Sequence, residues 1–176
     1  GKTHAISGRT GEALWTHASG AKMQVNPAVG DLDRDGVFDV VVASTDSRVY
    51  ALAGRDGKLL WSAATGAAVY SDPGLADLDG DGTPDVVVGS NDAQVRALSG
   101  KDGALLWTRT TGGQVLSSVV MARLDADPVP DALVLSSDRT LRALSGRDGR
   151  ELWSRRELDG VPLLVDDVDA DRTPDV

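Results

Sequence analysis

The strongest constraint on the fold is an internal repeat of 46 residues, marked by the four tryptophans. These stand at Trp15, Trp61, Trp107 and Trp153, each 46 residues after the one before. The segments that end at each tryptophan also repeat: AISGRTGEALW, ALAGRDGKLLW, ALSGKDGALLW and ALSGRDGRELW. A fixed period of this length indicates a repeat architecture, in which each repeat is one supersecondary unit that packs against its neighbours.

Each repeat is predicted to form four short strands. The first strand precedes an aspartate-rich segment, and the second follows it as the apolar runs FDVVVAS, PDVVVGS and PDALVLS. Continuous apolar runs are typical of strands that are covered on both faces. A turn rich in Asp and Ser leads to the third strand, and a Gly-containing turn leads to the fourth, which ends at the tryptophan. The sequence therefore predicts an all-β fold, a β-propeller built from 46-residue, four-stranded blades.

The repeat also predicts how the chain is divided. We expect a single β-propeller domain or segment over residues 1–176, forming an arc of a larger propeller with seven or eight blades. A closed four-bladed propeller is the alternative. An open arc would expose apolar blade faces, so self-association is expected in that case. The predicted parts are the second half of a blade (1–20), three whole repeats (21–66, 67–112 and 113–158) and the first half of a blade (159–176).

Composition and motifs exclude several classes of function. The net charge of −9 disfavours nucleic-acid binding, because the phosphate backbone would be repelled. The chain has no cysteine and two histidines, so it offers neither a disulfide framework nor a thiolate zinc site. No apolar run approaches the roughly 20 residues that span a bilayer. The sequence contains no G-x-S-x-G, H-E-x-x-H or phosphate-loop motif, and we expect a protein that is not an enzyme.

The acidity is concentrated in four segments that follow the predicted first strands. They read DLDRDGVFD, DLDGDGTPD, RLDADPVPD and DVDADRTPD, and they hold 15 of the 24 aspartates. Alternate residues of a tight loop point their carboxylates inward, where they repel one another unless a cation neutralises them. Calcium takes about 6–8 oxygen ligands, which such a loop supplies. The cofactor predicted for these loops is Ca²⁺.

Three of the four loops carry every acidic position of the pattern. In each, three alternate aspartates, a backbone carbonyl and an aspartate at the ninth position form the candidate cage. Gly36 and Gly82 permit the bend of the first two loops, whereas Arg172 stands at that position in the fourth, so weaker binding is expected there. The candidate ligands are Asp31, Asp33, Asp35, Val37 and Asp39; Asp77, Asp79, Asp81, Thr83 and Asp85; and Asp167, Asp169, Asp171, Thr173 and Asp175.

The third loop departs from this pattern. Arg123 replaces the first aspartate and Pro128 replaces the glycine. A guanidinium can pair with carboxylates and stand where a metal ion would be. We therefore expect no calcium in the third loop, and the head group of Arg123 among Asp125, Asp127 and Asp131.

Two known repeat families resemble these motifs over the whole chain. The Ala-x-Ser/Ala-Gly-x-x-Gly-x-x-x-Trp segment resembles the tryptophan-docking repeat of quinoprotein-like (PQQ-like) propellers. The D-x-D-x-D-G-x-x-D segment resembles the calcium loop of FG-GAP repeats, known from integrin α-subunits. The resemblance implies a propeller with calcium in the loop between the first two strands. The tryptophans are interpreted as blade-packing elements rather than as a platform for pyrroloquinoline quinone.

These observations favour a non-catalytic, calcium-stabilised propeller that recognises a protein or carbohydrate partner, in an extracellular or periplasmic setting. The alternatives are the propeller domain of a calcium-dependent polysaccharide lyase and a cofactor-free, quinoprotein-like assembly factor. The segments before the first strands vary most between repeats, and loops on a rigid scaffold often carry binding residues. The candidates for a partner-binding face are Lys22, Gln24, Asn26, Tyr70 and Gln114.

Overall fold

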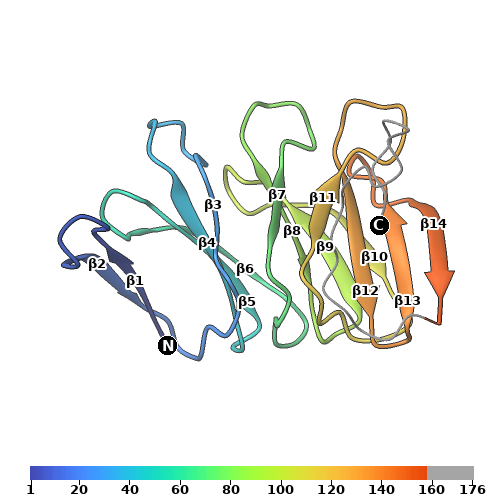
Figure 1. The fold of residues 1–176 in the computed structure, drawn as a ribbon, viewed down its shortest axis with the longest axis horizontal. Coiled ribbons are helices and arrows are strands. Elements are labelled where there is room, and N and C mark those ends of the chain that lie inside the picture. The colour runs from blue at the N-terminus through green and yellow to red at the C-terminus, as the bar shows by residue number, and fades with distance from the viewer. Residues whose placement is uncertain (158–176) are drawn as a thin grey trace.

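A computed structural model describes residues 1–157 of the protein, in which every regular element is a β-strand (Figure 1). The predicted fourth aspartate loop, Asp167 to Asp175, lies outside the described residues. The strands are β1 (Lys2–Ile6), β2 (Ala13–Ala18), β3 (Ala28–Gly30), β4 (Asp39–Ser44), β5 (Arg48–Leu52), β6 (Leu59–Ala64), β7 (Gly74–Ala76), β8 (Asp85–Gly89), β9 (Gln94–Leu98), β10 (Leu105–Thr110), β11 (Val120–Ala122), β12 (Asp131–Ser136), β13 (Thr140–Leu144) and β14 (Glu151–Arg156).

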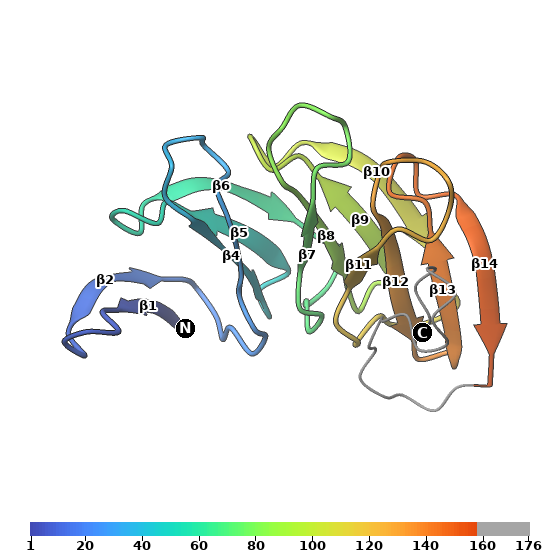
Figure 2. The same ribbon diagram turned by 45° about the horizontal axis from the view of Figure 1, so that its top comes forward.

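The strands form three four-stranded antiparallel sheets and one two-stranded sheet. Their orders are β3-β4-β5-β6, β7-β8-β9-β10, β11-β12-β13-β14 and β1-β2. We call the three large sheets the first, second and third blades, and β1-β2 the half-blade. Consecutive blades stand side by side, with β7 in contact with both β3 and β11. The sheets form an open arc, with the half-blade and β14 at opposite ends in both views (Figures 1 and 2). The all-β, propeller-like fold predicted from the repeat is confirmed.

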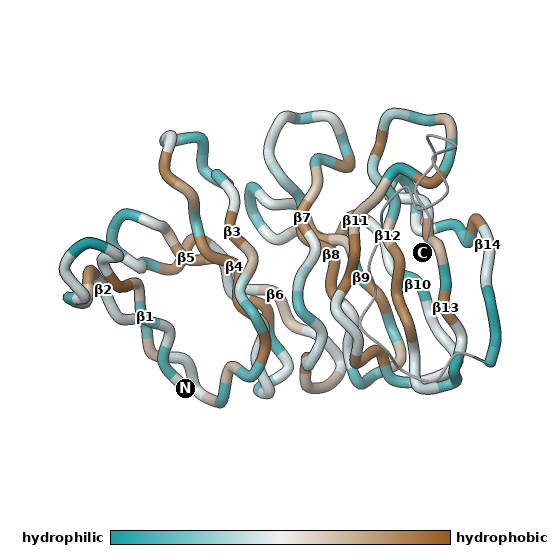
Figure 3. Tube along the Cα trace, viewed as in Figure 1, coloured by the Kyte–Doolittle hydropathy of each residue, from teal (hydrophilic) through white to brown (hydrophobic). Residues whose placement is uncertain are grey.

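The burial of each strand follows from its place in the blade. Every residue of β8 and β12 is buried, since these second strands are covered on both faces. The outermost strand β10 alternates instead, with Trp107 buried between exposed neighbours. Figure 3 shows the same trend, with apolar residues along the inner strands and polar residues in the loops. The continuous and alternating apolar patterns of the sequence therefore distinguish inner strands from the outer one.

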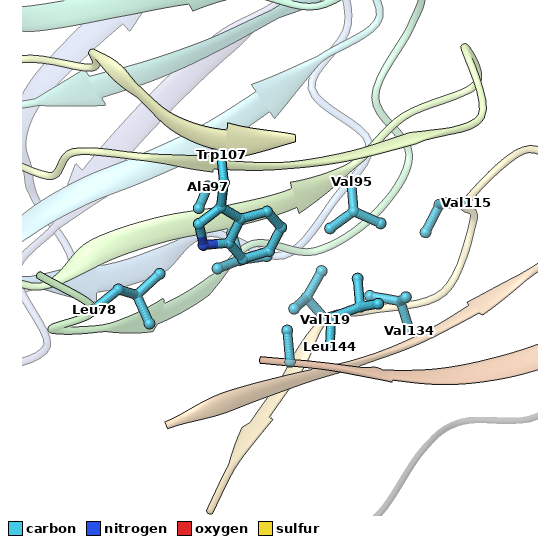
Figure 4. Packing of buried hydrophobic residues seen from close by; sticks show 10 residues of the cluster. Leu78, Val95, Ala97, Trp107, Val115, Val119, Val134 and Leu144 are labelled. Carbon is cyan, nitrogen blue, oxygen red and sulfur yellow. The ribbon is translucent and has the colours of Figure 1, made fainter. Parts of the chain in front are cut away.

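The apolar core lies between neighbouring blades rather than within one sheet. The interface of the second and third blades brings Trp107, Val95 and Ala97 against Val134 and Leu144 (Figure 4). A similar cluster fills the interface of the first and second blades. Each blade therefore needs its neighbour to bury its faces, as expected for a repeat protein. No helix that could span a membrane occurs in residues 1–157.

Candidate functional site

Three of the tryptophans join each sheet to the next through the Gly-x-x-Gly turn between its third and fourth strands. We call this turn, at residues 54–57, 100–103 and 146–149, the docking turn. The indole N–H groups donate to the carbonyl oxygen of the turn's first glycine at 2.7, 2.6 and 2.6 Å. The rings are only 6–8% exposed. The pairs are Trp15–Gly54, Trp61–Gly100 and Trp107–Gly146, which confirms the interpretation of the tryptophans as packing elements.

Both glycines of the docking turn are required by close contacts. The last glycine adopts φ of +70° to +73° in the three turns, and a Cβ atom there would lie 2.6–2.7 Å from the tryptophan ring of the preceding sheet. A Cβ atom on the first glycine would collide with a backbone carbonyl of its own blade, such as that of Pro84 against Gly100. No other residue type fits either position without a shift of the backbone.

The aspartate at the ninth position of each loop connects that loop to the docking turn. Asp39, Asp85 and Asp131 are each 1% exposed. In each, Oδ2 accepts the backbone N–H of the loop's second residue at 2.8 Å. Oδ1 accepts the N–H of the first docking-turn glycine at 2.9–3.2 Å. Burial raises the pKa of Asp85 and Asp131 above the usual range. These carboxylates therefore have a structural role that the metal-ligand pattern did not reveal.

The first two aspartate loops each bring three carboxylates together. Asp31, Asp33 and Asp39 form one group and Asp77, Asp79 and Asp85 the other, with one ligand atom from each residue within 4.8 Å of the others. Ligands about 2.4 Å from a calcium ion can be no more than about 4.8 Å apart, so these groups fit calcium. Each ninth-position oxygen already accepts one N–H but keeps a second lone pair for an ion. Among residues 1–157, the third loop holds no such group.

The aspartate at the fifth loop position is not part of either group, although it was predicted as a ligand. Asp35 forms an ion pair with Arg55 of its own docking turn, and the hydrogen bond from Arg55 holds the pKa of Asp35 below the usual range. Asp81 lies 3.4 Å from Arg34, which reaches across from the preceding blade and also donates to Thr83 Oγ1 at 3.1 Å. Arginines that are not at ligand positions of the motif therefore pair with the aspartate at the fifth position.

In both loops the backbone forms a turn at Val37 and Thr83, the two residues predicted to offer a carbonyl ligand. The N–H groups of Val37 and Thr83 donate to Oδ1 of Asp35 and Asp81, each at 2.7 Å. In the first loop, the N–H of Gly36 also donates to Asp31 Oδ2 at 3.0 Å. Carboxylates that accept such bonds bend the chain around its own aspartates, as the alternating pattern predicted.

The third loop contradicts one prediction. Arg123 is exposed, and within the described residues it forms no ion pair with Asp125, Asp127 or Asp131. The cation beside this loop is Arg147 of the docking turn, with Nε 3.6 Å from Asp127 Oδ2. The physical reason is that Arg123 follows the end of β11 with its side chain in water, where an exposed ion pair gains little.

The blades are also connected through the segments that precede their first strands. Asp72 accepts the backbone N–H of Asn26 at 2.7 Å and its side-chain amide at 2.9 Å. It also accepts the hydroxyl of Ser118 at 2.8 Å. The three residues are 46 positions apart, a signal that was readable in the sequence. Asn26, predicted as a candidate for partner binding, is therefore engaged in blade contacts.

An ion pair at the opposite ends of the strands predicts a pH effect. Arg142 Nη2 lies 2.6 Å from Asp138 Oδ2, with both side chains largely buried, and this hydrogen bond holds the pKa of Asp138 far below its usual range. A carboxyl group whose pKa is lower in the folded state than in the unfolded state stabilises the fold at pH values above the unfolded pKa, and this contribution is lost as pH falls.

We expect Asp138→Asn to reduce the free energy of unfolding by about 2 kcal/mol at pH 7. The difference should narrow between about pH 4 and pH 2, measured by urea denaturation; a constant difference would contradict it.

Comparisons with known proteins agree with this architecture. A model of the family described as outer membrane protein assembly factor BamB matches residues 1–114 and 80–170. The crystal structure of BamB from Moraxella catarrhalis is similar with a TM-score of 0.67 at 20% identity, covering 89% of this chain and 44% of that one. The chain therefore spans less than half the length of that protein.

Two further solved structures are similar to the chain. The computationally designed Ika4 protein has a TM-score of 0.64 at 16% identity, covering 89% of this chain and 84% of that one. BBS1N, solved in complex with ARL6DN, has a TM-score of 0.59 at 19% identity, covering 84% of this chain and 42% of that one. No curated protein sequence matches significantly. At these identities the structures establish a shared fold.

Proposed function

The chain belongs to the PQQ-like repeat family described as outer membrane protein assembly factor BamB, and from this membership we propose that it is a non-catalytic propeller scaffold that binds a protein partner. The observation that carries the proposal is the network of tryptophan, docking turn and ninth-position aspartate, which recurs at three successive sheet interfaces. In this network the tryptophan, the docking-turn glycines and the ninth-position aspartate of each repeat have a structural role. Such a network holds the blades rigidly, and a rigid scaffold presents its loops for binding.

A groove between the second and third blades suits a protein partner. It has a volume of about 500 Å³ and lies beside the second aspartate loop. Its lining combines apolar Leu106 and Val129 with charged Asp79 and Arg147. Apolar contacts surrounded by charged groups are typical of protein interfaces. This groove is the surface where we expect the partner to bind.

Calcium is proposed as the stabilising ion of the first two loops. The converging carboxylates support this proposal, since their mutual repulsion would be relieved by a divalent cation. When bound, calcium would fasten the loop between the first and second strands, and it would perform no chemistry. In the third loop, Arg147 and the missing first aspartate argue against an ion. An extracellular or periplasmic location is proposed together with calcium binding. Extracellular calcium modules typically have dissociation constants of about 10⁻⁴–10⁻³ M, so they are occupied where calcium is abundant.

Calcium is expected to raise the melting temperature of the wild-type chain. With a dissociation constant of about 10⁻⁴ M, 10 mM calcium would add about 2.7 kcal/mol per site, because only the folded state offers the site. Asp33→Asn and Asp79→Asn should each remove one site's share of this gain, measured by calorimetry with calcium and with EDTA. The matched control is Asp125→Asn in the third loop, whose calcium response should equal that of the wild type. No shift in melting with calcium would contradict the metal proposal.

Partner binding is tested separately on the groove. The immobilised wild-type chain, used in a pull-down with and without EDTA, should retain a protein. The Leu106→Asp variant should not retain that protein, and its circular dichroism should show the wild-type fold. Leu105→Asp is the matched control, because Leu105 is the exposed neighbour in β10 and does not line the groove. Binding on a glycan array in place of a protein would contradict the partner class. Turnover of an acidic polysaccharide, abolished by one substitution, would contradict the non-catalytic assignment.

A further inference from the structure

The groove between the second and third blades has a counterpart between the first and second blades. Because the repeat is 46 residues long, each residue that lines the groove corresponds to a residue 46 positions earlier. Three lining positions carry the same residue in both interfaces, and Arg147 corresponds to Lys101. The two interfaces differ most at the fourth position of the aspartate loop, which is Gly80 in the groove and Arg34 in its counterpart.

In the counterpart, the side chain of Arg34 crosses from one blade to the next. Its Nε donates to Thr83 Oγ1 at 3.1 Å, and its Nη2 donates to the backbone carbonyl of Asp81 and lies 3.4 Å from Asp81 Oδ1. In the groove the same path runs from Gly80 to Val129, and both of these residues line it. The chain itself therefore shows that an arginine side chain fits this geometry.

The path that Arg34 takes is open in the groove. Gly80 has φ of +79° and Arg34 has φ of +61°, so the backbone is left-handed at both positions. A Cβ atom on Gly80 would meet nothing within 4 Å. The volume of about 500 Å³ beside it is therefore available to a side chain from another molecule.

The third loop repeats the turn that receives Arg34 in the second loop. Oδ1 of Asp127 accepts the N–H of Val129 at 2.8 Å, as Oδ1 of Asp81 accepts that of Thr83 at 2.7 Å. A carboxylate oxygen has a further lone pair after one such bond. Asp127 can therefore accept a guanidinium in the way that Asp81 does.

Arg147 lies beside Asp127, with Nε 3.6 Å from Oδ2, but it does not exclude a second cation. Asp81 has two cations near it. A backbone hydrogen bond and the charges of Arg34 and Lys101 hold the pKa of Asp81 below its usual range. One aspartate of this turn thus accommodates both an arginine from outside its blade and the cation of its own docking turn.

We propose that the protein partner enters the groove with an arginine side chain, which pairs with Asp127 as Arg34 pairs with Asp81. This inference rests on the proposed function, because it names the group with which the partner binds. Leu106 and Val129 would cover the methylene groups of that arginine, while its charged head reaches the carboxylate. A lysine would bind less well, since an ammonium lacks the planar fork that donates to two acceptors at once.

The first test is an NMR titration of the full chain with the peptide acetyl-Gly-Leu-Arg-Leu-Gly-amide, in EDTA so that the result is independent of calcium. The wild type should bind one peptide, with the largest shift changes at the backbone amides of Gly80 and Val129. Peptides with citrulline or lysine in place of arginine should bind at least about 10-fold more weakly. Equal binding of the lysine peptide, or shift changes confined to residues 31–39, would contradict the proposal.

The second test exchanges the residues of the two interfaces. Gly80→Arg places an arginine of the chain in the groove and should weaken peptide binding at least about 10-fold. Gly80→Ala is the matched control, because it has the same backbone strain without the guanidinium, and it should bind like the wild type. Arg34→Gly should open the counterpart and raise the number of bound peptides per chain from one to two. A number that stays at one, or undiminished binding by Gly80→Arg, would overturn the proposal.

The pull-down separates this inference from the proposed function. Gly80→Arg should lose the protein that the wild type retains, and Gly80→Ala should keep it. If Leu106→Asp loses the protein while Gly80→Arg keeps it, the groove binds its partner without an arginine, and only the inference fails. If the peptide binds as expected but the wild type retains no protein, the proposed function fails and the guanidinium site stands.

Discussion

Replacing Trp61 with alanine is expected to lower the free energy of unfolding by about 3–5 kcal/mol, the largest effect of any single substitution considered. The indole is 6% exposed and donates to the Gly100 carbonyl at 2.6 Å. Alanine would leave a cavity between the first and second blades. It would also leave that buried carbonyl without its donor.

The measurement is urea denaturation followed by circular dichroism, with Phe38→Ala as the matched control. Phe38 is also aromatic but 70% exposed, so its loss should change stability by less than about 0.5 kcal/mol. A loss below about 1 kcal/mol for Trp61→Ala would show that the blades are held by their strand contacts alone. The docking network would then no longer explain the 46-residue repeat.

Asp131→Ala is expected to destabilise the fold by about 2–4 kcal/mol, and equally with calcium and with EDTA. Asp131 lies in the third loop, where no calcium is proposed, and it accepts the N–H groups of Leu124 and Gly146 at 2.8 and 3.2 Å. Alanine would leave both donors unsatisfied, at about 1–3 kcal/mol each. The raised pKa of the buried carboxyl shows that its charge is poorly solvated, which offsets part of this loss.

Two comparisons separate this structural role from metal binding. Asp125→Ala, in the same loop but exposed, should change stability by less than about 1 kcal/mol, because within residues 1–157 the Asp125 carboxylate accepts only the N–H of Asp127. Asp33→Ala should destabilise the chain chiefly in the presence of calcium. If Asp131→Ala were harmless in EDTA, the ninth-position aspartate would have no structural role, and the hydrogen bonds between loop and docking turn would be unimportant for stability.

The sequence alone predicted the parts of the fold that depend on local pattern. The apolar runs around Val41, Val87 and Leu133 indicated strands covered on both faces, and all three residues are fully buried. The spacing of the tryptophans predicted one packing element per blade, and the Gly-x-x-Gly segments predicted the hairpin turns. These predictions succeed because strand formation, turn geometry and the alternation of side chains between the two faces of a strand are set by neighbours along the chain. The alternation of aspartates similarly indicated the two groups of converging carboxylates.

Only the tertiary structure decided which groups of the aspartate loop and of the docking turn meet. The loop motif treated Asp35 and Asp39 as equivalent ligands, but Arg55 pairs with the first and backbone N–H groups hold the second. The motif also placed Arg123 among carboxylates, whereas Arg147 lies there. The contacts of Arg55, Gly54 and Arg147 depend on how a turn 15 to 20 residues away packs against the loop, and no local pattern encodes that packing. The repeat in the sequence therefore determined the strands and turns of each blade. The packing of the docking turn against the aspartate loop determined which charged groups surround each carboxylate.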